Sequence, residues 1–176
     1  MYLISLYFDD KTNKKIQRLI DKVAEDSENK YMIEGDVPPH ITVSAFETDE
    51  VEKVIESLDL KLKDIKEGDL QWVSIGAFNS RVIFLSVVLN QYLYKLSLSI
   101  YEGIESVPNV SVSRFYRPLQ WLPHTTIGKK LSQDETLVAF KTLQNNFAMF
   151  GGTVTRIGLS KTKPYEEIKE WVLKGH

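Results

Sequence analysis

The two halves of the chain repeat one order of expected elements, and this repeat restricts the fold more than any other feature of the sequence. In each half an amphipathic helix precedes a strand that begins with Pro-His-x-Thr, and a second helix and further strand follow. Two pseudo-equivalent lobes that face one another explain such a repeat. No low-complexity linker separates the halves, so we expect residues 1–176 to form a single domain without an independent boundary.

Hydrophobic periodicity locates the elements. Apolar residues recur at helical spacing over 16–24, 51–58 and 93–104. Ser132 and Glu135 form a capping box that starts a fourth helix, and we expect its buried face to hold Leu137, Phe140 and Phe147. Strands are expected at 2–8, 40–46, 70–78, 81–89, 124–129, 153–160 and 166–173, the third and fourth joined by a hairpin turn at 79–80.

Composition and charge narrow the class of protein. With 43% hydrophobic and 26% charged residues the chain has an ordinary globular composition. The absence of cysteine excludes a disulfide scaffold, a thiolate zinc site and a cysteine nucleophile. The sequence shows neither a signal peptide nor a membrane span, so we expect a soluble, cytoplasmic protein. The net charge of −2 argues against non-specific coating of nucleic acid. The stretch 106–131 nevertheless lacks Asp and Glu and contains Arg114 and Arg117.

Two of the three histidines lie in matching contexts, Pro39-His40-Ile41-Thr42 and Pro123-His124-Thr125-Thr126. On a strand, residues i and i+2 point to the same face, so each motif presents an imidazole beside a hydroxyl while its other side faces the core. A single His-x-Thr is usually structural, but the matched pair favours a functional site. His176 lies outside both motifs and is expected to be disordered or the remnant of a tag.

Two imidazoles on opposite sides of a phosphodiester supply a general base and a general acid, because their ordinary pKa lies near neutrality. The hydroxyls of Thr42 and Thr126 can donate to the non-bridging phosphoryl oxygens. Lys129 or Lys130, just after the second motif, can add positive charge near the phosphate. Strand alternation favours Lys130, because it continues the face of the second motif if the strand persists, whereas Lys129 faces away unless the strand bends.

With these motifs, the proline before each histidine and their separation of roughly eighty residues, the chain resembles the 2H phosphoesterase superfamily, which includes the 2′-5′ RNA ligase-like proteins and cyclic phosphodiesterases. The resemblance implies an α+β, bilobal, pseudo-symmetric fold in which two antiparallel sheets line a central cleft, with helices packed outside and one motif in each lobe. It implies cleavage of 2′,3′-cyclic or 2′-5′ phosphodiester bonds without a metal or cofactor. His40 and His124 take the catalytic positions, and Thr42 and Thr126 the phosphate-holding positions. Thr125 replaces the usual β-branched aliphatic residue, and lysine replaces the arginine that often follows the second motif.

Aromatic residues near the cleft are candidates for stacking on a base. Tyr116 and Trp121 are favoured because they lie in the acid-free loop before His124, and Tyr165 comes next. Phe46, Phe78 and Phe115 are further candidates.

The expected partner is an RNA terminus or a nucleotide with a cyclic phosphate, and the sequence indicates neither a membrane nor an obligatory protein partner. One alternative is a non-catalytic RNA or nucleotide binder that retains the cleft. Another is metal-assisted hydrolysis that uses both histidines with Glu34 or Asp36, although zinc sites usually need three or four protein ligands. The direction of the reaction, hydrolysis or ligation, stays open.

Overall fold

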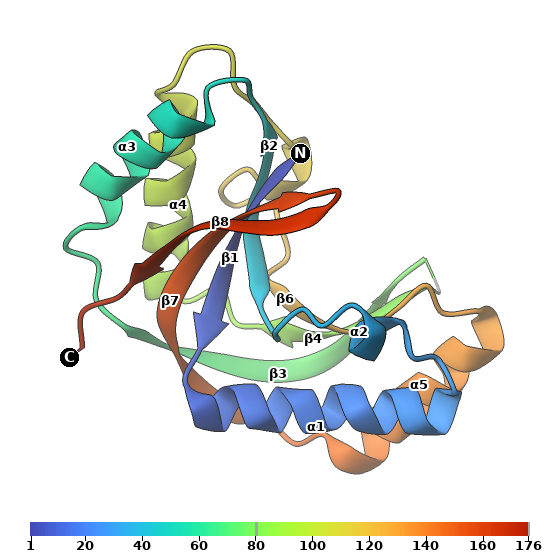
Figure 1. Cartoon of the computed structure of the whole chain (residues 1–176). Helices are drawn as coiled ribbons and strands as arrows, with labels where there is room; N and C mark the ends of the chain where they lie inside the picture. The colour runs from blue at the N-terminus through green and yellow to red at the C-terminus, as the bar shows by residue number, and fades with distance from the viewer. Residues whose placement is uncertain (80, 176) are drawn as a thin grey trace.

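The computed structural model describes residues 1–79 and 81–175 and shows an α+β protein with antiparallel strands (Figure 1). Ser80, in the expected hairpin turn, and His176 lie outside the described residues. The strands described are β1 (Tyr2–Phe8), β2 (Ile41–Glu47), β3 (Gly68–Phe78), β4 (Val82–Val87), β5 (Ser111–Val112), β6 (His124–Lys129), β7 (Phe150–Thr162) and β8 (Tyr165–Val172). The helices are α1 (Asp10–Ser27), α2 (Tyr31–Glu34), α3 (Val51–Leu62), α4 (Gln91–Glu105) and α5 (Gln133–Asn146), with a 3₁₀ helix η1 (Arg114–Tyr116).

The long strand β7 joins the expected two groups of strands into one hydrogen-bonded sheet. Its first residues pair with β3, and the stretch from Val154 onward pairs with β1 on one side and, from Arg156, with β8 on the other. The sheet order is β5-β2-β1-β7-β3-β4-β6, with β8 attached to β7. The predicted α+β class and antiparallel pairing are confirmed, while the two predicted sheets are continuous through β7.

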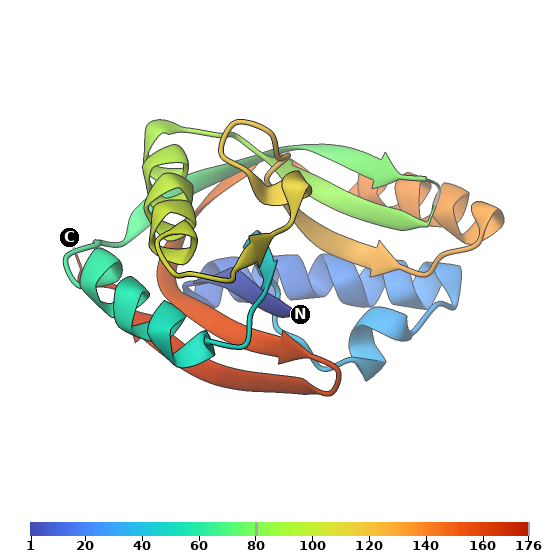
Figure 2. The same ribbon diagram turned by 90° about the horizontal axis from the view of Figure 1, so that it is seen from above.

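The sheet curls so that its two motif-bearing strands meet. Strands β2 and β6 are separated by four strands in the sheet order, yet they contact each other directly. Figure 2 shows β3, β4 and β6 on one side of the molecule and the β7–β8 hairpin on the other. This curl brings together two motifs that lie far apart in the chain.

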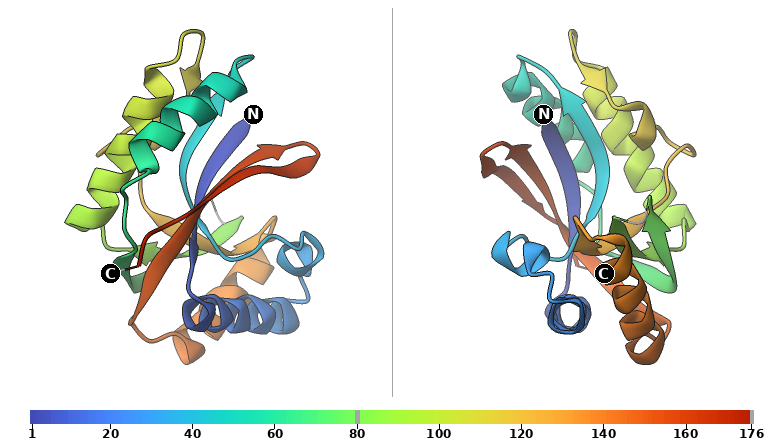
Figure 3. Two further views of the ribbon diagram at one scale, coloured as in Figure 1. Left: turned by 60° about the vertical axis from the view of Figure 1, so that its left-hand side comes forward. Right: turned by 90° about the vertical axis from the view of Figure 1, so that its right-hand side faces the viewer.

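Two pairs of helices cover the outside of the sheet. Helix α1 packs against α5, and α3 packs against α4, in separate places (Figure 3). The apolar stripe predicted for α1 is buried, with Ile16, Ile20 and Val23 each no more than 2% exposed. In the described residues, no helix combines the length and the apolar composition needed to cross a bilayer.

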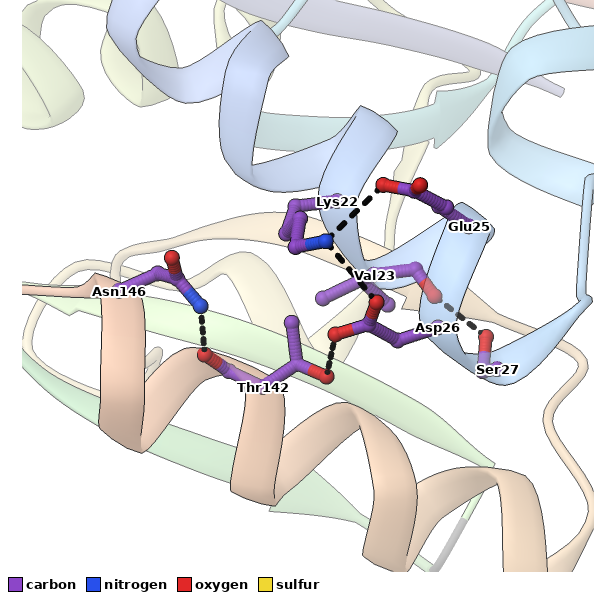
Figure 4. A network of polar contacts seen from close by, with 7 residues as sticks. All are labelled: Lys22, Val23, Glu25, Asp26, Ser27, Thr142 and Asn146. Carbon is purple, nitrogen blue, oxygen red and sulfur yellow. Dashed lines mark hydrogen bonds and ion pairs between the residues drawn. The ribbon is translucent and has the colours of Figure 1, made fainter.

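The buried face of α5 differs from the prediction. Leu137 and Phe140 are exposed, at 66% and 39%, and the helix packs through Ala139, Thr142 and Leu143 instead. The capping box of Ser132 with Glu135 is present as predicted. Ala139 and Leu143 are fully buried on this face. A polar contact lies beside them, because the Thr142 hydroxyl donates to the Asp26 carboxylate of α1 at 2.7 Å and Lys22 lies 3.1 Å from the same carboxylate (Figure 4). Small side chains at this contact let the two helices approach closely.

Candidate active site

A cavity of about 880 Å³ lies where β1, β2 and β6 meet. Eight of the nine side chains predicted for the site line it, and the ninth, Lys130, does not. The eight are His40, Thr42, Tyr116, Trp121, His124, Thr126, Lys129 and Tyr165. The two motifs therefore share one cavity, as the matched sequence contexts predict.

Each histidine is held by the same backbone contact. The Nδ1 atom of His40 lies 2.8 Å from the carbonyl oxygen of Pro38, and the Nδ1 atom of His124 lies 2.8 Å from the carbonyl oxygen of Leu122. A carbonyl oxygen only accepts hydrogen bonds, so Nδ1 carries the proton in both rings. When either ring is neutral, its Nε2 atom has a free lone pair and can accept a proton.

Burial lowers the pKa of both histidines. For His40, burial is the main cause; the hydrogen bond to Pro38 opposes it, and the positive charge of Lys129, together with that of His124 whenever His124 is protonated, lowers the pKa further. For His124, burial lowers the pKa against the hydrogen bond to Leu122. Both rings are therefore mainly neutral at pH 7 in the free protein, and protonating either of them is harder than in water. A bound anion opposes this effect, because a negative charge stabilises the protonated ring.

A β-bulge follows the threonine of each motif. In β2 the pairing with β1 shifts after Thr42, which lies opposite Ser5, while Ser44 lies opposite Ile4. In β6 the pairing with β4 shifts between Thr126 and Gly128. Each bulge adds one residue, Val43 or Ile127, and reverses the alternation of side chains beyond it.

The bulge at Ile127 corrects the prediction for the two lysines. Lys129 now shares the cavity face with His124 and Thr126, and it lines the cavity although it is largely exposed. Lys130 follows the strand with a positive φ of 57° and does not line the cavity; its ammonium group lies 4.4 Å from the ring centroid of Tyr31, a residue of the cavity wall. The sequence argument favoured Lys130 because it assumed a regular strand.

Of the aromatic residues predicted to lie near the cleft, all but Phe46 line the cavity. Phe78 and Phe115 line the cavity together with the three favoured aromatic residues. Phe46 does not, because it is only 1% exposed and stacks on Tyr2 in the core at 5.5 Å between ring centroids. Arg114 and Arg117 are also absent from the lining, and the Arg114 guanidinium lies 4.9 Å from the ring centroid of Phe115.

The alternative of a metal site depends on acidic residues beside the histidines. Glu34 lines the cavity and Asp36 does not. Within residues 1–79 and 81–175, no group of three or more His, Asp or Glu side chains is close enough together to hold a metal ion.

Comparison with known proteins identifies the family. The family model described as the 2′-5′ RNA ligase superfamily matches residues 8–166. The chain belongs to this superfamily. A Bacillus licheniformis protein named "Putative phosphoesterase" is 26% identical over 153 residues, which cover 84% of this chain and 83% of that protein.

Solved structures share the fold across nearly the whole chain. E. coli LigT complexed with 3′-AMP has a TM-score of 0.63 at 16% identity and covers 98% of this chain and 97% of its own. The Thermus thermophilus protein TT0787 has a TM-score of 0.62 at 16% identity and covers 99% and 98%. At these identities the likeness establishes the fold of the superfamily and nothing finer.

The middle residue of the second motif, Thr125, has a structural role. Thr125 is fully buried behind the second motif, and its hydroxyl accepts a hydrogen bond of 3.0 Å from the indole Nε1 of Trp72. A buried indole N–H without a partner is costly, so the threonine satisfies a donor that an aliphatic side chain would leave unpaired.

Sequence reasoning missed Tyr7 and Ser5 of β1, which line the cavity next to the first motif. The ring of Tyr7 lies 6.2 Å from that of His40, and burial together with a hydrogen bond to Tyr165 raises the pKa of its hydroxyl. The alternation of β1 places Ile4 and Leu6 in the core and therefore Ser5 and Tyr7 on the opposite face. This face can be assigned to the cavity only once β1 is known to lie beside β2.

Proposed function

We propose that the protein is a metal-independent phosphoesterase that hydrolyses 2′,3′-cyclic or 2′-5′ phosphodiester bonds by paired-histidine acid/base catalysis. One observation carries this proposal. Two histidines from distant segments line one cavity, and each has its Nδ1 atom held by a backbone carbonyl. This arrangement leaves two Nε2 atoms available to a single substrate, as an acid/base pair requires.

The proposed reaction uses one proton held by the pair. The neutral histidine removes a proton from a water molecule as its oxygen attacks phosphorus. The protonated histidine donates its Nε2 proton to the departing ribose oxygen, and the P–O bond to that oxygen breaks. The products are a phosphomonoester and a free hydroxyl. After the reaction the two histidines have exchanged protonation states, and proton exchange with water restores them.

Hydroxyl and ammonium groups stabilise the charge that develops at phosphorus. Thr42 and Thr126 lie beside their histidines on the cavity face and donate to the non-bridging oxygens. Lys129 adds a positive charge, because the bulge at Ile127 turns its side chain to the cavity face of the second motif. Tyr116, Trp121 and Tyr165 form the wall against which the nucleoside packs. Structures of E. coli LigT with 3′-AMP and with phosphate support a ligand of this chemistry in the shared fold.

The test measures turnover of 2′,3′-cyclic AMP and of a 2′-5′-linked dinucleotide after exhaustive EDTA treatment. We expect turnover by the wild type, and losses of about 10²–10⁴-fold for His40→Ala and for His124→Ala. Circular dichroism checks that both variants stay folded. Binding without turnover by the wild type would instead support a non-catalytic nucleotide binder. Activity lost with EDTA and restored by a divalent cation would support the metal-assisted alternative.

A further inference from the structure

Helix α5 has an apolar outer face in addition to its buried one. Leu137 is 66% exposed, and Phe140, on the same side of the helix, is 39% exposed. Single exposed apolar residues are common on soluble proteins, so their exposure alone decides nothing, and the order of the residues around them has to be considered. Within the described lining of the cavity there is no residue of α5. This outer face is therefore separate from the proposed active site.

The residues on this face have the spacing of a coiled-coil contact. Steps of four, three and four residues separate four exposed side chains, which are Gln133, Leu137, Phe140 and Gln144. Alternating steps of three and four residues place side chains on one stripe of a helix, as in helices that pack lengthwise against each other. The stripe reads the same in both directions: glutamine, apolar, apolar, glutamine. A second α5 that runs antiparallel therefore places Leu137 of each copy against Phe140 of the other.

Two charged residues beside the stripe are complementary in the same arrangement. Asp134 and Lys141 each directly follow a residue of the stripe, and both are exposed. In an antiparallel helix pair these flanking positions lie opposite one another, so Asp134 of each copy meets Lys141 of the other. In the described parts of the chain neither residue takes part in an ion pair. The outer face of α5 thus matches a second copy of itself in apolar side chains and in charge.

We propose that two copies of this chain associate through their α5 helices, which pack antiparallel about a two-fold axis. The axis passes the helix midway between Leu137 and Phe140, and each contact occurs twice, as a two-fold interface requires. Helix α1 packs against the opposite face of α5, where Thr142 contacts Asp26, so the stripe faces outward (Figure 3). A contact made by one helix from each copy falls below the roughly 1,200 Å² of a standard interface. The dimer should therefore be weak, with a dissociation constant between about 1 µM and 1 mM.

Analytical ultracentrifugation of the full chain at concentrations from about 10 µM to 1 mM tests the association. We expect the mean mass to rise with concentration above the 20.3 kDa of the monomer. Leu137→Ser removes the central apolar contact from both copies and should weaken the association at least about tenfold. Leu60→Ser is the matched control, because Leu60 is 77% exposed on α3 and lies outside the stripe. It should leave the dissociation constant unchanged, and circular dichroism checks that both variants stay folded.

Reversal of the charges tests the antiparallel arrangement. Asp134→Lys and Lys141→Asp each bring like charges together twice in the dimer, and each should weaken the association about tenfold. The double variant Asp134→Lys/Lys141→Asp restores both attractive pairs, so its dissociation constant should return to within about threefold of the wild type. A mixture of the two single variants should form a heterodimer for the same reason. Glu52→Lys is the matched control, because Glu52 is also the exposed second residue of a helix, and it should change nothing.

A mean mass that stays at 20.3 kDa up to about 1 mM would overturn the inference. Association that is unchanged in Leu137→Ser would overturn it too, because the contact would then lie elsewhere on the molecule. A double charge variant that associates no better than the two single variants would contradict the antiparallel pairing. Each of these results leaves the proposed function standing, because the stripe and the described lining of the cavity share no residue.

Discussion

Replacing Lys129 with glutamine tests the bulge at Ile127, which decides which lysine reaches the substrate. In the structure Lys129 lines the cavity, and its charge lowers the pKa of His40. Lys130 does not line the cavity and instead contacts the ring of Tyr31 in the cavity wall. A regular strand would exchange these two positions. The pair of variants Lys129→Gln and Lys130→Gln therefore separates the two geometries with the same chemical change.

The size of the effect follows from the interaction that is lost. A hydrogen bond to a charged group contributes about 1.5–3 kcal/mol, which corresponds to a loss of about 10- to 150-fold in kcat/KM for Lys129→Gln. Lys130→Gln removes a cation–π contact, which should lower the free energy of unfolding by about 0.5–1 kcal/mol and leave kcat/KM unchanged.

The assay is kcat/KM for 2′,3′-cyclic AMP over a pH range from about 4.5 to 8.5, which spans the ordinary histidine pKa. Removing the positive charge of Lys129 raises the pKa of His40, so the inflection that belongs to His40 should move to higher pH in Lys129→Gln. It should stay in place in Lys130→Gln. A larger loss of activity in Lys130→Gln than in Lys129→Gln would refute the reasoning from the bulge.

Three further predictions concern the histidines, the core behind them and the start of α1. Because the free protein must hold one proton on two histidines whose pKa values are lowered, kcat/KM should be highest below about pH 6.5 and fall as the pH rises; a maximum in mildly alkaline solution would contradict this. Thr125→Val leaves Trp72 Nε1 unpaired and should lower the free energy of unfolding by about 1–3 kcal/mol in urea titrations. Trp72→Phe should lower the free energy of unfolding less when it is made in the Thr125→Val variant than when it is made in the wild type. Burial raises the pKa of Asp9, but hydrogen bonds from Thr12 and Thr153 outweigh it and lower the pKa overall. Asp9→Ala should therefore cost about 1–2 kcal/mol of stability at neutral pH, and the difference should shrink as the pH falls below the ordinary aspartate pKa and Asp9 becomes protonated.

The sequence contained enough information to predict the site wherever local rules apply. Alternation along a strand places His40 with Thr42 and His124 with Thr126, and all four line one cavity. The capping box at Ser132 also follows from local sequence, because its hydrogen bonds join residues only three positions apart.

Prediction failed where distant contacts decide the local geometry. The bulge that selects Lys129 depends on how β6 pairs with β4, and nothing in the segment 124–130 indicates the shift. The buried face of α5 depends on its packing against α1, where Thr142 contacts Asp26, a residue 116 positions away. The place of Tyr7 in the cavity wall depends on β1 lying beside β2, which periodicity cannot show.

The central claim is that both histidines act on one phosphorus atom, and a crystal structure with inorganic phosphate or 3′-AMP bound tests it most directly. The account predicts that the Nε2 atoms of His40 and His124 both lie about 3 Å from oxygens of the same phosphate group, with the hydroxyls of Thr42 and Thr126 on its other oxygens. A phosphate that contacts only one of the two motifs, or binds outside the cavity that they share, would contradict it.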